Sequence, residues 1–158
     1  MGPSPIEADP AVEAERRLRA AGLARTPQRR AVLTELLGRT DHPTAEQIYE
    51  AVSRRLPGIS RATVYRVLDA FTERGLLNRI QHADSVGRFD GRVDRHHHLL
   101  CERCGGLSDL EASALPELPI PAGADLGGFR IADYRITLHG VCPDCSGDAH
   151  DPPSNPTP

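Results

Sequence analysis

Apolar positions in the first half of the chain recur every three or four residues, the spacing that places side chains on one side of a helix. In residues 11–22 these positions are Val12, Leu18 and Ala21, and Gly22 follows as a stop signal. The pattern therefore predicts a short amphipathic helix close to the start of the chain.

The next two predicted helices carry their own start signals. Thr26 stands as a cap before the helix predicted over 26–37, and the proline that follows it fits the first turn of a helix. A third helix is predicted over 44–58, where Thr44 and Gln47 form the capping-box pattern. Its apolar face consists of Ile48, Val52 and Leu56.

A fourth helix is predicted to open on Ser60, run over 61–74 and end at Gly75. Its apolar side consists of Val64, Val67, Leu68 and Phe71. The pattern then changes to two short strands within 76–91, around the turn Ala-Asp-Ser-Val-Gly. Helices followed by a two-stranded wing predict a winged helix-turn-helix, with 61–74 as its recognition helix.

Polar residues off the apolar face of the recognition helix make double-stranded DNA a candidate partner. The residues expected to contact the operator are Ser60, Arg61, Thr63, Tyr65 and Arg66, with Arg19 and Arg25 on phosphate or in the minor groove. The alternative is that the helices are only a packing unit and that these side chains form a solvated surface.

The second half of the chain alternates apolar and polar residues as strands do. Strands are predicted over 95–101, 105–111 and 129–142. The last of these rests on the alternation of Phe129, Ile131, Ile136 and Leu138. The Pro- and Gly-rich stretch 113–128 predicts a loop or a short broken helix. The fold class is therefore α+β, an N-terminal winged helix-turn-helix domain followed by a small α/β domain.

Composition adds a division of charge to this picture. Residues 1–80 hold 13 arginines and 10 acidic residues, a net charge of +3, whereas residues 81–158 hold 6 arginines and 12 acidic residues, a net charge of −6. This asymmetry suggests two domains with different roles. No apolar run approaches the roughly 18 residues of a membrane helix, and the acidic N-terminus does not resemble a secretory signal, so we expect a cytoplasmic protein.

Four cysteines form two Cys-x-x-Cys pairs, separated by 37 residues. Each pair can present two thiolates to a tetrahedral ion, and in a reducing compartment such pairs favour a metal over disulfides. We therefore expect a structural zinc, held by Cys101, Cys104, Cys142 and Cys145. The alternatives are unligated structural cysteines or a redox dithiol pair.

A run of three histidines precedes the first cysteine pair. On a strand His96 and His98 share one face, so they are the natural pair of imidazole ligands, and His97 is expected to be exposed or outside the ligand shell. Asp90 and Asp109 are candidate further ligands. Nitrogen and oxygen ligands of this kind suit Fe(II), Mn(II), Zn(II), Co(II) or Ni(II).

Several segments together resemble the ferric uptake regulator family, and they are closest to its peroxide-responsive branch. They are TPQRRAVLTELL, HPTAEQIYEAV, SRATVYRVLDAFTERGLL, RFD, HHHLLCERCGG and GVCPDC, in order over roughly residues 12–146. The resemblance implies a homodimeric repressor that reads AT-rich palindromic operators through its winged helix. It also implies that the second domain is a dimerisation domain holding the four-cysteine zinc.

The resemblance implies a regulatory iron or manganese site as well. Its ligands correspond to His42, Asp90, His96, His98 and Asp109. Iron-uptake repressors more often carry glutamate where this sequence has Asp90, and in peroxide sensors iron directs oxygen onto a ligand histidine, here His42 or His96. We therefore expect a hydrogen peroxide sensor that controls oxidative-stress genes, with no small organic ligand.

Two other interpretations stay open at the level of sequence. The protein could be an iron- or zinc-uptake repressor of the same family, or a metal-dependent enzyme, although no substrate pocket or separate general base is evident. The expected division is a flexible extension over 1–11, a DNA-binding domain over 12–87, a hinge over 88–94, a metal-binding dimerisation domain over 95–146 and a disordered tail over 147–158.

Overall fold

The computed structural model describes residues 9–80, 87–119 and 126–147, and the chain divides into two compact units after Val93. The predicted Ala-Asp-Ser-Val-Gly turn, except for its Gly87, lies outside the described residues, as do the N-terminal residues 1–8 and nearly all of the predicted tail. None of the described helices is long and apolar enough to cross a membrane.

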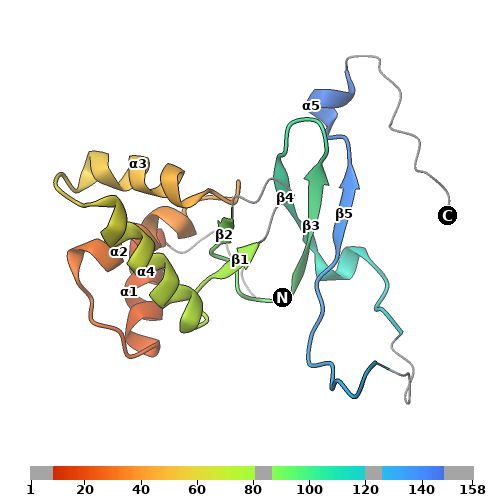
Figure 1. Cartoon of the computed structure of the whole chain (residues 1–158), viewed down its shortest axis with the longest axis horizontal. Coiled ribbons are helices and arrows are strands. Elements are labelled where there is room, and N and C mark those ends of the chain that lie inside the picture. The colour runs from red at the N-terminus through yellow and green to blue at the C-terminus, as the bar shows by residue number, and fades with distance from the viewer. Residues whose placement is uncertain (1–8, 81–86, 120–125, 148–158) are drawn as a thin grey trace. The chain divides into compact units, whose positions relative to one another are not determined.

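Four helices make up most of the first unit (Figure 1). They are α1 (Pro10–Ala20), α2 (Pro27–Leu37), α3 (Ala45–Arg55) and α4 (Arg61–Glu73). The predicted caps are confirmed: Thr26 and Ser60 accept hydrogen bonds from the amides three residues on, and Thr44 and Gln47 form a reciprocal capping box. The core between the helices is apolar and includes Leu18, Leu33, Ile48, Leu68 and Phe71, all fully buried.

The first helix differs in part from its prediction. It starts at Pro10 on an Asp9 cap, so residues 10 and 11 belong to a helix rather than to a flexible extension. Ala14 and Leu18 are buried, whereas Val12 is 64% exposed. Position 12 lies two residues from position 14, about 200° around the helix, and therefore faces away from the core.

A two-stranded wing completes the first unit. Strand β1 (Asn78–Ile80) pairs antiparallel with β2 (Arg88–Asp90). Residues 88–90, assigned to the hinge from sequence, thus lie in the wing because their backbone forms a ladder with β1. An isolated bridge from Thr44 to Arg88 also joins β2 to the turn before α3.

The second unit is a three-stranded sheet in the order β4-β3-β5 (Figure 1). Its elements are β3 (His96–Cys101), β4 (Leu107–Glu111), the 3-10 turn η1 (Ala112–Ala114), β5 (Thr137–Gly140) and α5 (Pro143–Ser146). Strand β3 is antiparallel to β4 and parallel to β5. Among the described residues of this unit the only buried hydrophobic ones are Leu100, Cys101 and Leu107, so the core is thin.

The prediction of a strand over 129–142 was wrong for the first part of that range. Only Thr137–Gly140 is a strand, and Phe129 is 76% exposed. In the parallel register Thr137 lies opposite His98, and β3 begins only two residues before His98. Residues before about position 135 would lie beyond the first residue of β3, so they have no strand to pair with.

Candidate metal centres and DNA-binding face

Two cysteine turns meet at one end of the sheet in the second unit. The parallel register places Cys101 opposite Gly140, so the turns that follow β3 and β5 lie side by side. The four sulfur atoms, those of Cys101, Cys104, Cys142 and Cys145, all lie within 4.8 Å of one another. The Sγ atoms of Cys104 and Cys142 are 3.8 Å apart. Thiolates bound at about 2.3 Å around a tetrahedral zinc are separated by about 3.8 Å, so the spacing fits zinc.

Backbone amides support ionised sulfur at this site. The amide of Cys142 donates to Cys101 Sγ over 3.3 Å, and that of Gly106 donates to Cys104 Sγ over 3.4 Å. Amide donation, from Cys104 first and then from Cys142, lowers the pKa of Cys101 to about 6. Hydrogen bonds with the crowded thiols, Cys142 first, raise the pKa of Cys145 to about 12. Full ionisation therefore needs a cation among the sulfurs, and zinc supplies the soft divalent charge.

A second cluster of ligand atoms lies across β3 and β4. His96 and His98 share one face of β3, and their Nε2 atoms are 3.1 Å apart. Asp109, opposite His98 in the register, places Oδ1 3.5 Å from His96 Nε2 and 4.0 Å from His98 Nε2. Ligand atoms about 2.1 Å from one ion are separated by about 3.0–3.4 Å at octahedral or tetrahedral angles. The separation between the two nitrogens lies in this range and that between His96 and Asp109 lies just above it, whereas His98 and Asp109 would have to approach each other to bind one ion. Nitrogen and oxygen ligands of this kind suit a divalent ion of intermediate hardness.

The orientation of His96 has a local cause that the sequence did not reveal. Its Nδ1 atom lies 2.8 Å from the carbonyl oxygen of Asp94. A proton on Nδ1 satisfies that carbonyl, and this tautomer presents the Nε2 lone pair toward His98 and Asp109. The backbone at Asp94 thus orients a candidate ligand without touching the ion.

His97 lies on the opposite face and is buried, not exposed as one sequence interpretation had it. Its Nδ1 accepts a hydrogen bond from the amide of Ile136 over 3.3 Å, and its ring stacks on Tyr134 with centroids 6.0 Å apart. The residue packs against the segment before β5, which covers the face of β3 that faces away from the ligand atoms. His97 therefore has a packing role within the second unit.

The two remaining candidate ligands belong to the first unit. His42 lies in the turn between α2 and α3 with a positive φ of 50°, and Asp90 ends β2. The two segments are joined because Arg88 Nη1 donates to the carbonyl of His42 over 3.1 Å and Phe89 N donates to the carbonyl of Pro43 over 2.9 Å. Asp90 Oδ1 accepts a hydrogen bond of 2.7 Å from the amide of Arg92.

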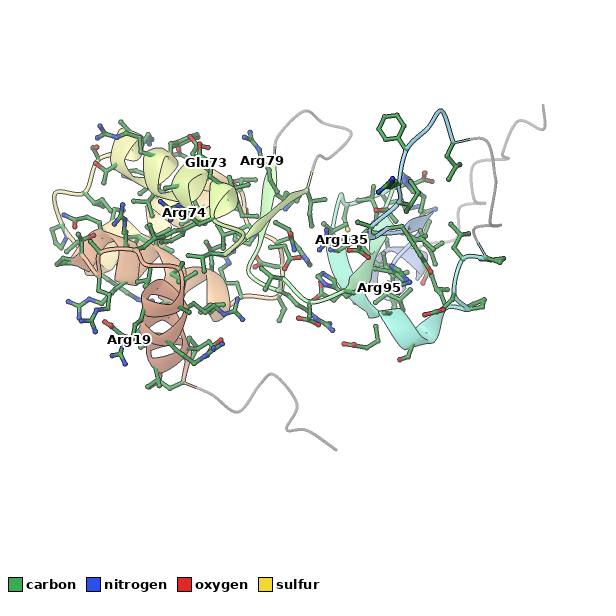
Figure 2. The ribbon with its side chains drawn as sticks, turned by 90° about the horizontal axis from the view of Figure 1, so that it is seen from below. Arg19, Glu73, Arg74, Arg79, Arg95 and Arg135 are labelled. Carbon is green, nitrogen blue, oxygen red and sulfur yellow. The ribbon has the colours of Figure 1, made fainter. Side chains whose placement is uncertain are left out.

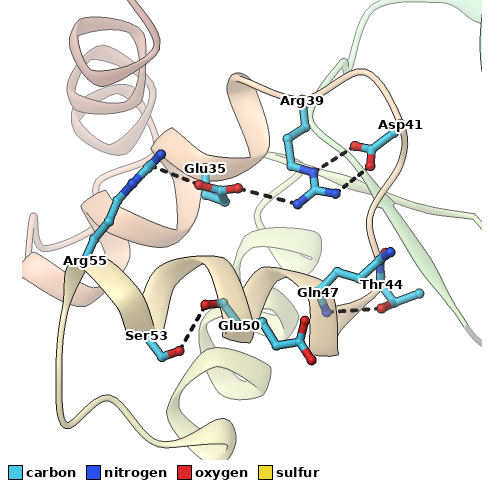
Figure 3. Close-up of polar contacts among 8 residues, drawn as sticks. All are labelled: Glu35, Arg39, Asp41, Thr44, Gln47, Glu50, Ser53 and Arg55. Atoms are coloured by element: carbon cyan, nitrogen blue, oxygen red, sulfur yellow. Dashed lines mark hydrogen bonds and ion pairs between the residues drawn. The ribbon is translucent and has the colours of Figure 1, made fainter.

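Ion pairs brace the turn that carries His42 (Figure 3). Arg39 binds Asp41, with 2.8 Å between Nε and Oδ1, and it also lies 3.5 Å from Glu35 on α2. Glu35 in turn accepts a bond of 3.0 Å from Arg55 on α3. The turn is thus fixed to both flanking helices, and the capping box of α3 holds its far end.

The residues expected to contact DNA come from α4 and from α1 and its following turn. Tyr65 and Arg66 are exposed on α4, and Arg19 is exposed on α1, where Figure 2 labels it. Ser60 and Thr63 are engaged in the cap of α4, with their hydroxyl oxygens 2.9 Å apart. The cap therefore accounts for the positions of both hydroxyl groups in the absence of DNA. The exposed side chains of α4 remain accessible to a duplex.

Two of the predicted contacts are arginines that the structure pairs with acidic residues. Arg25 lies 3.5 Å from Glu15. Arg61 makes a closer pair with Glu46 on α3. Neither acidic partner was predicted, because both pairs join residues that are ten or more positions apart in the chain.

The family model described as Ferric uptake regulator family matches residues 20–139. The chain belongs to this family. Family members are transcriptional regulators rather than enzymes, which removes the enzyme interpretation. The match spans elements of both units.

Two curated relatives cover most of the chain. It is 39% identical over 134 residues to the "Peroxide operon regulator" of Bacillus subtilis (strain 168), which covers 85% of this chain and 92% of the relative. It is 36% identical over 133 residues to the "Peroxide-responsive repressor PerR" of Staphylococcus epidermidis, which covers 84% of this chain and 88% of the relative. The names of both relatives contain the word peroxide.

Solved structures of the family have the same fold. The Campylobacter jejuni peroxide stress regulator matches with a TM-score of 0.61 at 25% identity, covering 85% of this chain and 97% of that one. A zinc-bound manganese uptake regulator matches with a TM-score of 0.60 at 26% identity, covering 82% and 98%. The second of these structures is described as a zinc-bound regulator of manganese uptake.

Proposed function

We propose that this family member is a metal-dependent transcriptional repressor that senses hydrogen peroxide. Two curated relatives named for peroxide, each covering more than four fifths of the chain, support this choice of branch. We also infer that it acts in the cytoplasm as a homodimer on AT-rich palindromic operators and controls oxidative-stress genes.

The observation that carries the proposal is the convergence of two imidazole nitrogens and one carboxylate oxygen. His96, His98 and Asp109 form a hard-to-intermediate ligand group, distinct in chemistry from the thiolate group. A protein that needed zinc only to fold would not need a second group of this kind. The two groups therefore support two metals, a structural Zn(II) and a regulatory Fe(II) or Mn(II).

We propose that His42 and Asp90 of the first unit complete the regulatory site. A metal bound by ligands from both units would stabilise one arrangement of the units, and binding energy present only in that arrangement shifts the population toward it. By thermodynamic linkage, DNA that selects the same arrangement would tighten metal binding. The braced turn at His42 supports this role, because a rigid ligand transmits the constraint to the helices.

Iron(II) held by these residues would supply the redox chemistry that activates hydrogen peroxide, which manganese(II) would not readily supply. In our proposal one oxygen atom of the peroxide is transferred to the imidazole ring of His42 or His96, the other leaves as water, and the oxidised ring is a poorer ligand. The metal is then no longer held by ligands from both units, the arrangement of the units that favours the operator is no longer stabilised, and the repressor dissociates from the DNA.

In vitro selection from a randomised duplex library tests this function, because selection does not require a known operator sequence. Zinc-containing protein loaded with Mn(II) is expected to retain AT-rich palindromes, and the iron-loaded protein is expected to release them after a small dose of hydrogen peroxide. Retention of DNA by iron-loaded protein after peroxide would indicate a metal-uptake repressor instead. Failure to retain any duplex with either metal would contradict DNA binding altogether.

A further inference from the structure

Arg61, the first residue of the recognition helix, is engaged by a carboxylate in the absence of DNA. Its Nη2 lies 2.7 Å from Glu46 Oε1, and its Nε lies 2.9 Å and 3.1 Å from the two carboxylate oxygens. The guanidinium also lies over the ring of Tyr49, 4.5 Å from the centroid. The carboxylate and the ring, both from α3, therefore hold Arg61 against that helix.

The carboxylate binds the same N–H edge of the guanidinium that a phosphate would bind. Arginine binds carboxylates and phosphates through the same pair of parallel N–H groups. Both side chains are solvent-accessible, Arg61 at 63% and Glu46 at 41%, so a phosphate could reach the pair and replace the carboxylate. Arg61 and Glu46 together present no net charge to a duplex until that exchange occurs.

The ion pair between Arg61 and Glu46 contributes little to the stability of the fold. Exposed ion pairs contribute little to folding. Helix α4 is already capped by Ser60 and α3 by the Thr44–Gln47 box, so neither helix start depends on the pair. The position of the pair is more informative, because Arg61 and Tyr65 are four residues apart and share one exposed side of α4.

We propose that Glu46 is an affinity-setting residue that withholds Arg61 from DNA until its carboxylate is displaced. On a random duplex, a phosphate must displace the carboxylate and gains little by doing so. On an operator that seats α4 closely in the groove, Arg61 exchanges Glu46 for a phosphate or base edge, and the operator complex therefore loses the ion pair. The inference rests on the proposed DNA-binding function and adds a residue that lowers the affinity for DNA by up to the free energy of that pair.

The test compares Glu46→Gln, Arg61→Gln and the double variant with the unchanged protein, all loaded with zinc and Mn(II). Affinity is measured against salt on a duplex without a palindrome and on a selected operator. For the random duplex, Glu46→Gln is expected to steepen the salt dependence by about 0.9 per added phosphate contact, or about twice that for a dimer. The non-specific affinity is expected to rise about two- to fivefold per subunit, the range of an exposed ion pair. Operator affinity is expected to rise at least as much, because the operator complex no longer has to break the ion pair.

A matched control separates this role from a general effect of charge. Glu50 lies one turn further along α3, and its carboxylate makes no hydrogen bond or ion pair within the described ranges. The hydrogen bond drawn to Glu50 in Figure 3 runs from Ser53 Oγ to its backbone carbonyl, over 3.0 Å. Glu50→Gln removes the same charge and is expected to change non-specific affinity much less than Glu46→Gln. Circular dichroism of each variant checks that α3 and α4 remain folded.

Two results would overturn the inference. One is an equal gain in non-specific affinity from Glu46→Gln with and without Arg61, and the other is an equal gain from Glu50→Gln. Either result would mean that Glu46 acts only as a negative charge. If the unchanged protein bound neither duplex, the proposed function itself would fail, which is a separate outcome.

Discussion

The Nε2 atoms of His96 and His98 face each other at 3.1 Å across one side of β3. Because His96 directs Nδ1 toward the carbonyl of Asp94, its Nε2 is the acceptor nitrogen in the neutral ring. His98 Nε2 can therefore either donate a proton to His96 Nε2 or bind the same cation as His96. The pair can hold a metal ion when His98 presents its Nε2 lone pair, and Asp109 adds a carboxylate oxygen to the same place.

Adjacent histidines on β3 should respond differently to replacement. His98→Ala is expected to lower Mn(II) affinity by at least about tenfold, because even residues outside the ligand shell change metal affinity by that factor. His97→Ala is expected to leave Mn(II) affinity nearly unchanged but to destabilise the second unit by about 1–3 kcal/mol, since a buried, hydrogen-bonded ring is lost. Titration calorimetry and thermal melting measure the two effects. A loss of Mn(II) binding in both variants, with equal stability, would contradict the assignment of the two faces.

The thiolate site should control folding of the second unit. Cys142→Ser is expected to abolish zinc binding and the cooperative melting of this unit, because few apolar residues are buried there and structural zinc contributes on the order of 10 kcal/mol in small domains. Elemental analysis and circular dichroism provide the measurements. Ser108→Ala, an exposed change on β4, is the control and should keep its zinc. A zinc-free variant that still melts cooperatively would show that zinc is dispensable for the fold.

The positive φ of His42 determines which variant removes its imidazole cleanly. At a φ of 50° most residues with a Cβ, alanine included, are strained by about 1–2 kcal/mol, whereas asparagine and histidine adopt this region more readily. His42→Asn is therefore expected to retain the stability of the first unit and to lose metal-dependent DNA binding, and His42→Ala should also lose some stability. Thermal melting and DNA retention with Mn(II) distinguish the two variants. Undiminished DNA binding by His42→Asn would remove His42 from the regulatory site.

Acid stability of the first unit should depend on Glu13. Its pKa is lowered from 4.5 to about 2, chiefly by hydrogen bonds from Arg16 at 2.6 Å, with Arg17 contributing at 2.7 Å. Because the folded pKa lies below the unfolded value, the stabilisation is present above about pH 4.5 and is lost as the pH falls toward 2. After allowance for solvent screening, Glu13→Gln is expected to cost about 0.5–1 kcal/mol at pH 7.

Melting the unchanged protein and the Glu13→Gln variant from pH 7 down to pH 2 measures this dependence. The difference in stability should shrink over the acidic half of the range, whereas Glu50→Gln, a change on the same unit, should stay close to the unchanged protein throughout. A constant difference for Glu13→Gln at every pH would mean that packing, rather than the charge, is the cause. Arg17 also donates to the carbonyl of Gly91 over 2.7 Å, so the pair helps hold the chain just after Asp90.

Local signals predicted much of the fold. Thr26, Thr44 and Ser60 each start the helix expected of them, since a cap acts within one turn and needs no information from elsewhere. The two cysteine pairs also come together because each Cys-x-x-Cys turn is local, and only one parallel strand pairing is needed to join them.

Features that depend on distant segments could not be predicted in this way. The burial of His97 depends on Ile136, almost forty residues away, and the length of β5 depends on where β3 begins. Val12 satisfied a helical spacing, yet the buried stripe of α1 follows Ala14 and Leu18 because the partner helix contacts that side. The Glu46–Arg61 pair likewise exists only once α3 and α4 pack together.

Peptide mass spectrometry after a small dose of hydrogen peroxide is the sharpest test of peroxide sensing by this protein. Zinc-containing protein is loaded with Fe(II) or with Mn(II), treated, digested and analysed for added oxygen. We predict oxygen on the peptide containing His42 or on that containing His96, in the iron sample alone. Intact histidines in a sample that demonstrably holds iron would contradict peroxide sensing, and the protein would then be a metal-responsive repressor without that chemistry.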